Sequence, residues 1–148
     1  MSTEMHSKTA RQAWMGLLAR ADGARLAALL PDLPPHDWLR PPEIGAVMVR
    51  GRIGATGAPF NLGEMTVTRC TLQLADGSVG HAHVQGRDKG HATRAALVDA
   101  LMQGPEAARI ETEVLATLRA EEAVRRQTRA EKAAATKVEF FTLVRGED

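Results

Sequence analysis

The segment QGRDKGH, from Gln85 to His91, combines charged side chains, two glycines and a histidine where an expected strand gives way to an expected helix. Asp88 is placed to cap that helix, which puts His91 at the third position of its first turn. The free N–H groups of a helix N-terminus favour anions, and Arg87 and Lys89 add two cations beside it. The segment is a candidate site for a phosphate or carboxylate group. The alternative is an ordinary capped helix with solvated basic side chains.

His91 could serve such a site as an acid, a base or an anion ligand. It could equally be a structural histidine that bonds to a neighbouring loop. Asp99 lies two helical turns further on, too far from His91 for a direct hydrogen bond. The GxxxxGK[ST] spacing of a nucleotide-binding P-loop is absent, so the spacing assigns no nucleotide to this segment.

Weaker candidates lie on the expected strands and the loop between them. Arg50 and Arg52 share one face of a strand predicted for 44–53, because side chains alternate along a strand. Arg69, on the next strand, could complete a basic patch, but this depends on a strand order that the sequence leaves open. Alternatively, these arginines are solvated or pair with acidic helical residues. Thr56, in the glycine-rich loop 54–63, could touch a ligand, although a wide turn explains the loop as well.

A metal site is a further alternative, because His81 and His83 lie on one face of an expected strand. A catalytic zinc site needs three protein ligands. If Asp76 and Gly77 form a two-residue hairpin turn, Cys70 lies opposite His83 and could be the third. Aliphatic residues occupy the same face, so packing explains the pattern equally well, and we predict no metal ion. Cys70 among apolar neighbours is not expected to be a nucleophile.

Hydrophobic periodicity predicts the elements that must position these residues. Helices, grouped strands, further helices and a last strand indicate an α+β fold with an antiparallel sheet and a single domain over residues 1–148. We expect helices near 10–21 and 26–30, strands at 44–53, 66–74 and 79–84, a buried helix at 89–103, a long charged helix at 106–136, and a C-terminal strand at 138–144.

The last two of these elements favour contact with another chain. The long helix has an apolar stripe of Ile110, Val114 and Leu118, but only alanines follow Val124 on that stripe. A helix with so thin a stripe projects or lies against a partner. The expected strand 138–144 (VEFFTLV) is apolar on both faces, so it is either central in the sheet or covered by a partner.

Composition excludes several classes of function. With 19 basic and 18 acidic residues the net charge is +1, and aromatic residues are 3% of the chain, which disfavours nucleic-acid binding. No apolar run approaches the roughly 18 residues of a membrane span. The single cysteine permits no intrachain disulfide, and the polar N-terminus does not read as a signal peptide. We therefore expect a cytoplasmic protein.

Several segments together resemble the PhnG family of the bacterial carbon–phosphorus lyase machinery. The block Gly51–Met102 has the family's G-x-T-G loop, T-x-T-R-C strand, D-G hairpin and V-Q-G-R-D-x-x-H-A segment in order. The segments 11–15 (RQAWM) and 138–146 (VEFFTLVRG) are similar to the family's opening helix and closing strand. Large aromatic residues replace His81 and His83 in some members, which favours packing over metal binding.

The resemblance implies a subunit of the carbon–phosphorus lyase complex, enzymatic only within that assembly. With PhnH, PhnI and PhnL, the family supports transfer of methylphosphonate to C1′ of ATP with release of adenine, and PhnJ later cleaves the carbon–phosphorus bond. PhnI is the expected direct partner, ATP is a substrate of the complex, and no cofactor is expected on this chain. Arg87 and Lys89 could then face the triphosphate. The alternatives are a purely structural adaptor and a stand-alone phosphate-binding enzyme.

Overall fold

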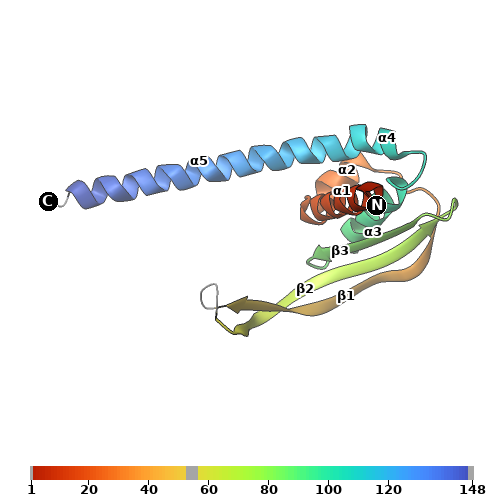
Figure 1. Ribbon diagram of the computed structural model, residues 1–148, viewed down its shortest axis with the longest axis horizontal. Helices are drawn as coiled ribbons and strands as arrows, with labels where there is room; N and C mark the ends of the chain where they lie inside the picture. Colours follow the sequence, from red (N-terminus) through yellow and green to blue (C-terminus); the bar gives the residue numbers. More distant parts are fainter. Residues whose placement is uncertain (1, 53–56, 147–148) are drawn as a thin grey trace.

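The computed structural model describes the backbone of residues 2–52 and 57–146, and the side chains of residues 10–52, 57–60 and 62–140. The elements, in chain order (Figure 1), are α1 (Ser2–Arg20), α2 (Gly23–Leu29), β1 (His36–Arg52), β2 (Pro59–Leu74), β3 (Val79–Gln85), α3 (Lys89–Leu101), α4 (Ala107–Ile110), a π-helical turn η1 (Glu111–Leu115), and α5 (Ala116–Gly146). The expected α+β class and antiparallel sheet are confirmed. None of the described helices is long and apolar enough to cross a membrane.

A sheet of order β1-β2-β3 forms one layer, and α3 packs on one of its faces. Helices α1 and α2 and the segment from α4 to η1 surround α3 on its other sides (Figure 1). The predicted burial of α3 is confirmed, because most of its side chains are inaccessible to solvent. The core consists of aliphatic residues from these helices and from the α3-facing side of the sheet, among them Leu18, Leu26, Leu72, Val84, Leu97, Ile110 and Leu115.

β3 approaches α3 unusually closely at Gly80. A Cβ atom at this position would lie 1.9 Å from the backbone oxygen of Ala96 and 2.9 Å from the backbone nitrogen of Ala100. Real side chains do not approach backbone atoms this closely, so only glycine fits between the strand and the helix. This contact fixes the distance between the sheet and the helix that carries the candidate site.

The turn between β2 and β3 is one residue longer than predicted. Leu74 donates its N–H to the oxygen of Ser78, and Gly77, with a φ of 92°, donates to the oxygen of Leu74. Three residues, Ala75 to Gly77, therefore form the loop, a common hairpin type with glycine in the left-handed conformation. The two-residue turn expected at Asp76 and Gly77 is wrong.

That single residue changes every cross-strand pair, because side chains alternate between the two faces of a strand. Cys70 pairs with Ala82, and His83 pairs with Arg69. Cys70 is buried toward α3, whereas His81 and His83 are exposed on the opposite face. The pairing of Cys70 with His83 is therefore wrong, and Cys70 cannot join the two histidines around one metal ion.

β1 and β2 are longer than expected. β1 begins at His36 rather than near Ile44, and it passes through Pro41 and Pro42 with register shifts on either side of Arg40. Proline is tolerated here because β1 is an edge strand, and its register shifts accommodate the missing donors. β2 begins at Pro59, inside the loop expected at 54–63. Both strands continue past the end of β3 as a two-stranded arm (Figure 1).

The expected C-terminal strand at 138–144 is not formed, because these residues continue helix α5. No glycine or proline occurs between Pro105 and Gly146, so nothing interrupts the helix, and each added residue contributes one backbone hydrogen bond. A strand would instead need a neighbouring strand edge to satisfy its backbone groups. β-branched and aromatic residues favour strands only in such a setting. The long charged helix expected at 106–136 is broadly confirmed, with a π-helical turn near its start.

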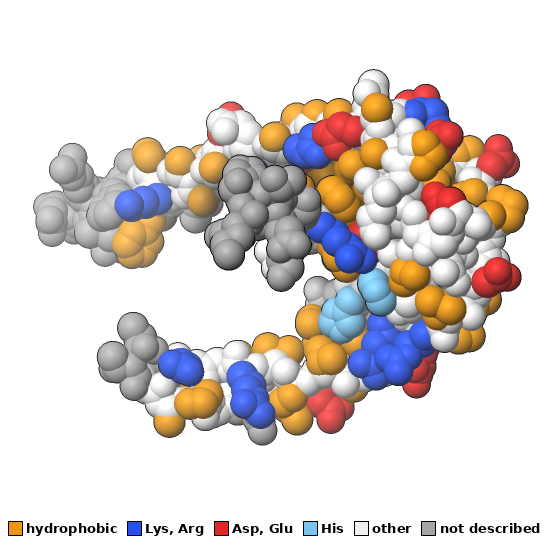
Figure 2. All heavy atoms as spheres, turned by 45° about the vertical axis from the view of Figure 1, so that its right-hand side comes forward, with side chains coloured by type: hydrophobic (Ala, Val, Ile, Leu, Met, Phe, Trp, Pro, Cys, Tyr) orange, Lys and Arg blue, Asp and Glu red, His pale blue; other side chains and the backbone are white. Residues whose placement is uncertain are grey.

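The two projecting elements give the molecule an open shape. α5 extends away from the body, and its side chains from Ala123 to Phe140 are exposed. The arm formed by β1 and β2 extends in the same general direction (Figure 1). Figure 2 shows the hollow between them, with histidine, lysine and arginine side chains gathered at its inner end. We refer to this space as the hollow below.

Candidate functional site

The turn between β3 and α3 carries the strongest candidates from the sequence. The side chain of Asp88 accepts a hydrogen bond from the N–H of His91 at 3.0 Å, which confirms Asp88 as the N-cap of α3. The carboxylate therefore occupies the position in which a helix N-terminus would hold an external anion. Anion binding at this turn must depend on side chains rather than on the helix end.

Gly86 fixes the backbone just before that cap. Its φ is 96°, a conformation that glycine adopts far more readily than other residues. Its N–H donates to the oxygen of Thr66 at 2.9 Å, and the hydroxyl of Thr68 donates to the oxygen of Gly86 at 2.7 Å. The N–H and the C=O of Gly86 are thus both bonded to β2, which anchors the turn.

Arg87 and Lys89 project from this anchored turn and are exposed. Within the described part of the chain, neither cation has a hydrogen bond or an ion pair. The turn lies at the body's end that faces the space between α5 and the arm (Figure 1). Two free cations on a rigid backbone are thus available to an anionic ligand or partner.

His91 does not share that exposure. It is 7% exposed, and its Nε2 donates to the backbone oxygen of Leu18 at 2.8 Å. This bond satisfies the last turn of α1 and joins it to the first turn of α3. In this geometry His91 positions two helices, and its Nε2 is not directed at the exposed cations.

Two arginines and two histidines lie on the sheet face opposite α3. Arg69 pairs directly with His83 across β2 and β3, and the hydroxyl of Thr71 lies 3.0 Å from Nδ1 of His81. Arg40 pairs with Thr71 from β1. Arg69, His81, His83 and Arg40 are all exposed, so this face is basic. The sequence did not indicate Arg40, because the bulges of β1 decide which way it points.

The strand order, which the sequence left open, keeps Arg69 apart from Arg50 and Arg52. Arg69 pairs with Glu43, whereas Arg50 pairs with Asn61 near the tip of the arm. Seven residues separate Glu43 from Arg50, which corresponds to roughly 23 Å along a strand. Arg50 and Arg52 do lie on one exposed face of β1, as expected. Thr56 lies outside the described residues.

Gln85 ends β3 with an exposed side chain and pairs with Val67. It lies on the same strand face as His83, two residues away, because side chains alternate. Of the weaker candidates, Gln85 and Arg69 are therefore the ones that lie near the β3–α3 turn.

Asp99 is a buried carboxylate that the sequence reasoning did not assign a role. It is fully buried and accepts hydrogen bonds from Arg11 Nε at 3.1 Å, Arg11 Nη2 at 2.9 Å, and Trp14 Nε1 at 2.8 Å. The N–H of His81 donates a further bond to it at 2.9 Å. Hydrogen bonding to Asp99 raises the pKa of the Arg11 guanidinium. Asp99 is the one carboxylate in the largely apolar sequence of α3. A buried carboxylate needs hydrogen-bond donors or a cation, so this pattern could have indicated a buried polar cluster.

Cys70 is buried, and its Sγ donates to the backbone oxygen of Ala92 at 3.3 Å. Burial raises the pKa of this thiol to about 11. The reactive thiolate is therefore scarce at neutral pH, in agreement with the expectation that Cys70 is not a nucleophile.

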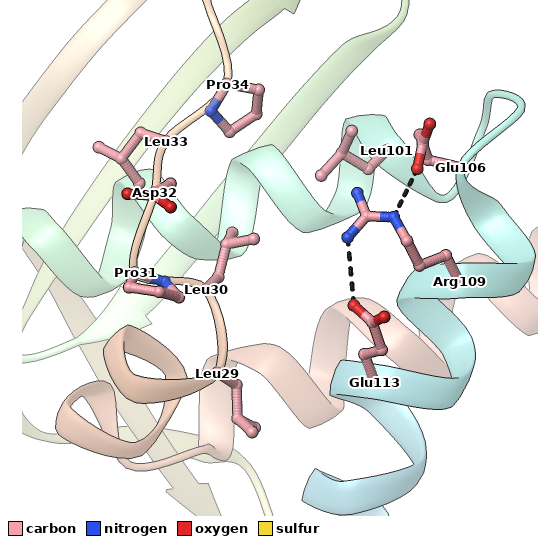
Figure 3. A pocket seen from close by; sticks show the side chains of 10 residues that line it. All are labelled: Leu29, Leu30, Pro31, Asp32, Leu33, Pro34, Leu101, Glu106, Arg109 and Glu113. Atoms are coloured by element: carbon pink, nitrogen blue, oxygen red, sulfur yellow. Dashed lines mark hydrogen bonds and ion pairs between the residues drawn. The ribbon is translucent and has the colours of Figure 1, made fainter.

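The cavity of about 520 Å³ shown in Figure 3 does not fit a polyanion. It lies between the segment that links α2 to β1 and the start of α4. Arg109 is the one cation among its lining residues, and it donates to Glu106 at 2.6 Å and to Glu113 at 3.1 Å. With Asp32 also in the lining, the cavity carries excess negative charge. A triphosphate would be repelled from it.

Comparison with known proteins gives a consistent result. The family described as phosphonate metabolism protein PhnG matches residues 9–146. A protein of Rhizobium meliloti (strain 1021), named alpha-D-ribose 1-methylphosphonate 5-triphosphate synthase subunit PhnG, is 47% identical over 145 residues, which covers 93% of this chain and 90% of that protein. Both matches span the arm, the β3–α3 turn and α5. The chain therefore belongs to the PhnG family of phosphonate metabolism proteins.

Proposed function

We propose that the chain is a subunit of an alpha-D-ribose 1-methylphosphonate 5-triphosphate synthase. In this reaction an oxygen of methylphosphonate forms a bond to C1′ of ATP. The bond from C1′ to N9 breaks, and adenine leaves with the electron pair and takes up a proton. The subunit acts with PhnH, PhnI and PhnL, and PhnJ belongs to the wider assembly. It binds no cofactor of its own, and we expect it in the cytoplasm, where ATP is available.

The observation that carries this proposal is the 47% identity, over nearly the whole chain, to a protein named as this subunit. At this level of identity over nearly the whole chain, the two proteins share a fold. The family match runs from residue 9 to residue 146, so it includes the projecting elements as well as the core.

The geometry supports a role that depends on partners. In the described part of the chain, no three His, Cys, Asp or Glu side chains converge on a metal position. The cavity shown in Figure 3 is acidic, while the free cations Arg87 and Lys89 lie on an open surface. α5 and the arm expose Val124, Met48 and Leu62 by 65%, 49% and 62%. Projecting elements with exposed apolar side chains are typical of surfaces that another chain covers. We propose a PhnI-type subunit as the direct partner.

Omission of single components tests this function. PhnH, PhnI and PhnL are combined with ATP and methylphosphonate, with and without this chain, and released adenine is measured by chromatography. We expect release only when this chain is present, and none from this chain alone. Full release without it would exclude the subunit role, and release by the isolated chain would favour the stand-alone enzyme.

Within that complex, we propose that Arg87 and Lys89 lie close to the triphosphate. They are unpaired cations on a fixed turn, and Gln85 and Arg69 lie near them. Asp88 and His91 hold the turn and the helix in place. We expect the double variant Arg87→Ala/Lys89→Ala to raise the KM for ATP by at least about a hundredfold, because each charge-assisted contact contributes roughly 1.5–3 kcal/mol when formed and roughly 1.4 kcal/mol is a factor of ten.

A matched variant separates this role from a general loss of charge. Arg109→Ala/Arg119→Ala removes two exposed cations that pair with glutamates elsewhere, so we expect little change in the KM for ATP. Unchanged KM in Arg87→Ala/Lys89→Ala, with the complex intact, would show that the two cations do not contact substrate. Loss of the complex in that variant would assign them to assembly instead.

A further inference from the structure

The outer edge of β3 is only partly closed. In the antiparallel ladder, Leu74 bonds to Ser78 and Gly86 bonds to Thr66, so the even-numbered residues of β3 direct their backbone groups toward β2. The odd-numbered residues, Val79, His81, His83 and Gln85, therefore direct their N–H and C=O groups away from the sheet. β3 is an edge strand, and these groups are available to whatever lies beside it.

Side chains bond one outward backbone group of each residue in the first half of this edge. Asp99 accepts the N–H of His81 at 2.9 Å, and the side chain of Gln103 donates to the oxygen of Val79 at 2.8 Å. These contacts prevent another strand from pairing at this end. Natural proteins usually protect the edges of their sheets in some such way. In the described part of the chain, the outward N–H and C=O groups of His83 and Gln85 have no such partners. The second half of the edge is open.

A small pocket of about 220 Å³ adjoins the open half of the edge. It lies between α1 and β3, and its helical wall includes Met15, Gly16 and Ala19, which are half-buried. An added strand would run about 4.8 Å from β3. Because α1 packs against both α3 and β3, the side chains on one face of the added strand would point into this pocket. Glycine and alanine on the helix leave room for small apolar side chains only.

The charges on the other side of the sheet specify the other face of such a strand. His83 and His81 are exposed there, and Arg69 pairs with His83. Arg87 follows two residues after Gln85. Side chains directly across a strand pair interact, so acidic side chains on the added strand would lie beside this basic face. Figure 2 shows the histidines and cations at the inner end of the hollow, where a partner segment can enter.

We propose that the edge at His83 and Gln85 accepts an extended segment of another subunit of the complex as a fourth strand. The segment alternates small apolar residues, which face α1, with acidic residues, which face Arg69 and His83. Backbone hydrogen bonds supply the affinity, and the alternating side chains supply the specificity, as in other cases of strand addition. The identity of the partner as a subunit of the synthase rests on the proposed function.

Amide hydrogen exchange in the isolated chain and in the assembled complex tests the proposal directly. We expect the amides of His83 and Gln85 to exchange at least about tenfold more slowly in the complex, because an added strand protects the groups it bonds. The N–H of His81 is already bonded to Asp99 and serves as an internal reference. Unchanged exchange at His83 and Gln85 in an active complex would overturn the added strand and leave the proposed function intact.

A pair of variants at one position provides a second test. His83→Pro removes the outward N–H while leaving the bonds to β2 in place, since proline is tolerated at outward-facing edge positions. His83→Thr removes the same imidazole but keeps the N–H. We expect His83→Pro to bind the partner subunit at least about tenfold more weakly than His83→Thr. Equal binding by two folded variants would contradict the proposal, and circular dichroism verifies the folding of each.

A second copy of this chain is the competing occupant of the edge. If the amides of His83 and Gln85 became protected in the isolated chain as its concentration rose, the edge would pair with another copy. That result would overturn the assignment to a different subunit.

Discussion

At the scale of single residues, Asp99 joins three elements that are far apart in the sequence. Arg11 and Trp14 of α1 and the backbone of His81 in β3 all donate to its carboxylate. The side chain of Asp99 is fully buried, whereas that of Arg11 is 36% exposed. Removing the carboxylate would leave buried donors without an acceptor, which costs more than the loss of an exposed ion pair.

We therefore predict that Asp99→Ala lowers the free energy of unfolding by about 2–6 kcal/mol, because the donors of Trp14 and His81 lose their acceptor at roughly 1–3 kcal/mol each. Urea denaturation measures this. The control is Glu121→Ala, which breaks the exposed pair of Arg25 and Glu121 and should cost less than about 1 kcal/mol. Similar costs for the two variants would contradict a structural role for Asp99.

Cys70 supports a prediction on reactivity and pH. Its pKa is raised by burial to about 11, from an ordinary value of 9.0. The folded chain thus holds the thiol proton more tightly than the unfolded chain, so this contribution to stability is present below pH 9.0 and is lost as the pH rises toward 11. We expect Cys70 to react with a disulfide reagent at pH 8 only as fast as the protein unfolds. Rapid reaction without urea would show that the thiol is accessible.

At the scale of elements, the contact between β3 and α3 is the least tolerant of change. Gly80→Ala would place a methyl group on the backbone of Ala96, so β3 would have to move away from the helix. We predict a loss of about 3 kcal/mol in the free energy of unfolding, the upper end of the usual cost of overpacking. Gly45→Ala on β1, where no atom lies within 4 Å of the added carbon, is the matched control and should be close to neutral.

Helix α5 should tolerate substitution in its distal half without loss of stability in the body, because the described side chains there are exposed and do not belong to the core. We predict that Ala134→Pro, which costs about 3 kcal/mol within a helix, lowers the helical circular dichroism signal but leaves the thermal midpoint of the body unchanged. Binding to the partner subunit should weaken. Ala134→Gln keeps the helix and is the control. A lowered thermal midpoint, or unaltered binding, would show that α5 has a different role.

At the scale of the whole molecule, the arm and α5 flank the hollow into which the β3–α3 turn and the open edge of β3 face (Figures 1 and 2). The isolated chain leaves apolar side chains exposed on both projections. A partner that enters the hollow would bury these side chains and approach the free cations at the same time. Assembly and substrate contact are thus expected at neighbouring surfaces.

We predict that Met48→Glu/Leu62→Glu on the arm leaves the thermal stability of the isolated chain unchanged and reduces co-purification with the partner subunit. The side chains are 49% and 62% exposed, so charging them costs little unless another chain covers them. Leu39→Glu alters a leucine of β1 that is 56% exposed near the other end of the strand and should not affect assembly. An equal effect of both changes would argue against the arm as the contact surface.

Features that depend on near neighbours along the chain could be predicted from the amino-acid sequence. The period of apolar residues identified most helices and strands, Asp88 was recognised as a cap three residues before the N–H that it accepts, and the aspartate–glycine pair marked a hairpin. The order of motifs identified the family. Each of these signals can be recognised from a few neighbouring residues, or from the order of motifs along the chain.

Features that depend on contacts between distant segments could not be predicted from the sequence and follow from the fold. One extra residue in the hairpin loop set the register, so Cys70 and His83 lie on opposite faces. Strand pairing placed Arg69 far from Arg50. Packing brought Arg11 to Asp99, 88 residues away. The residues 138–144 resemble a strand locally, yet form a helix, because a strand requires a neighbouring edge whereas a helix satisfies its own backbone.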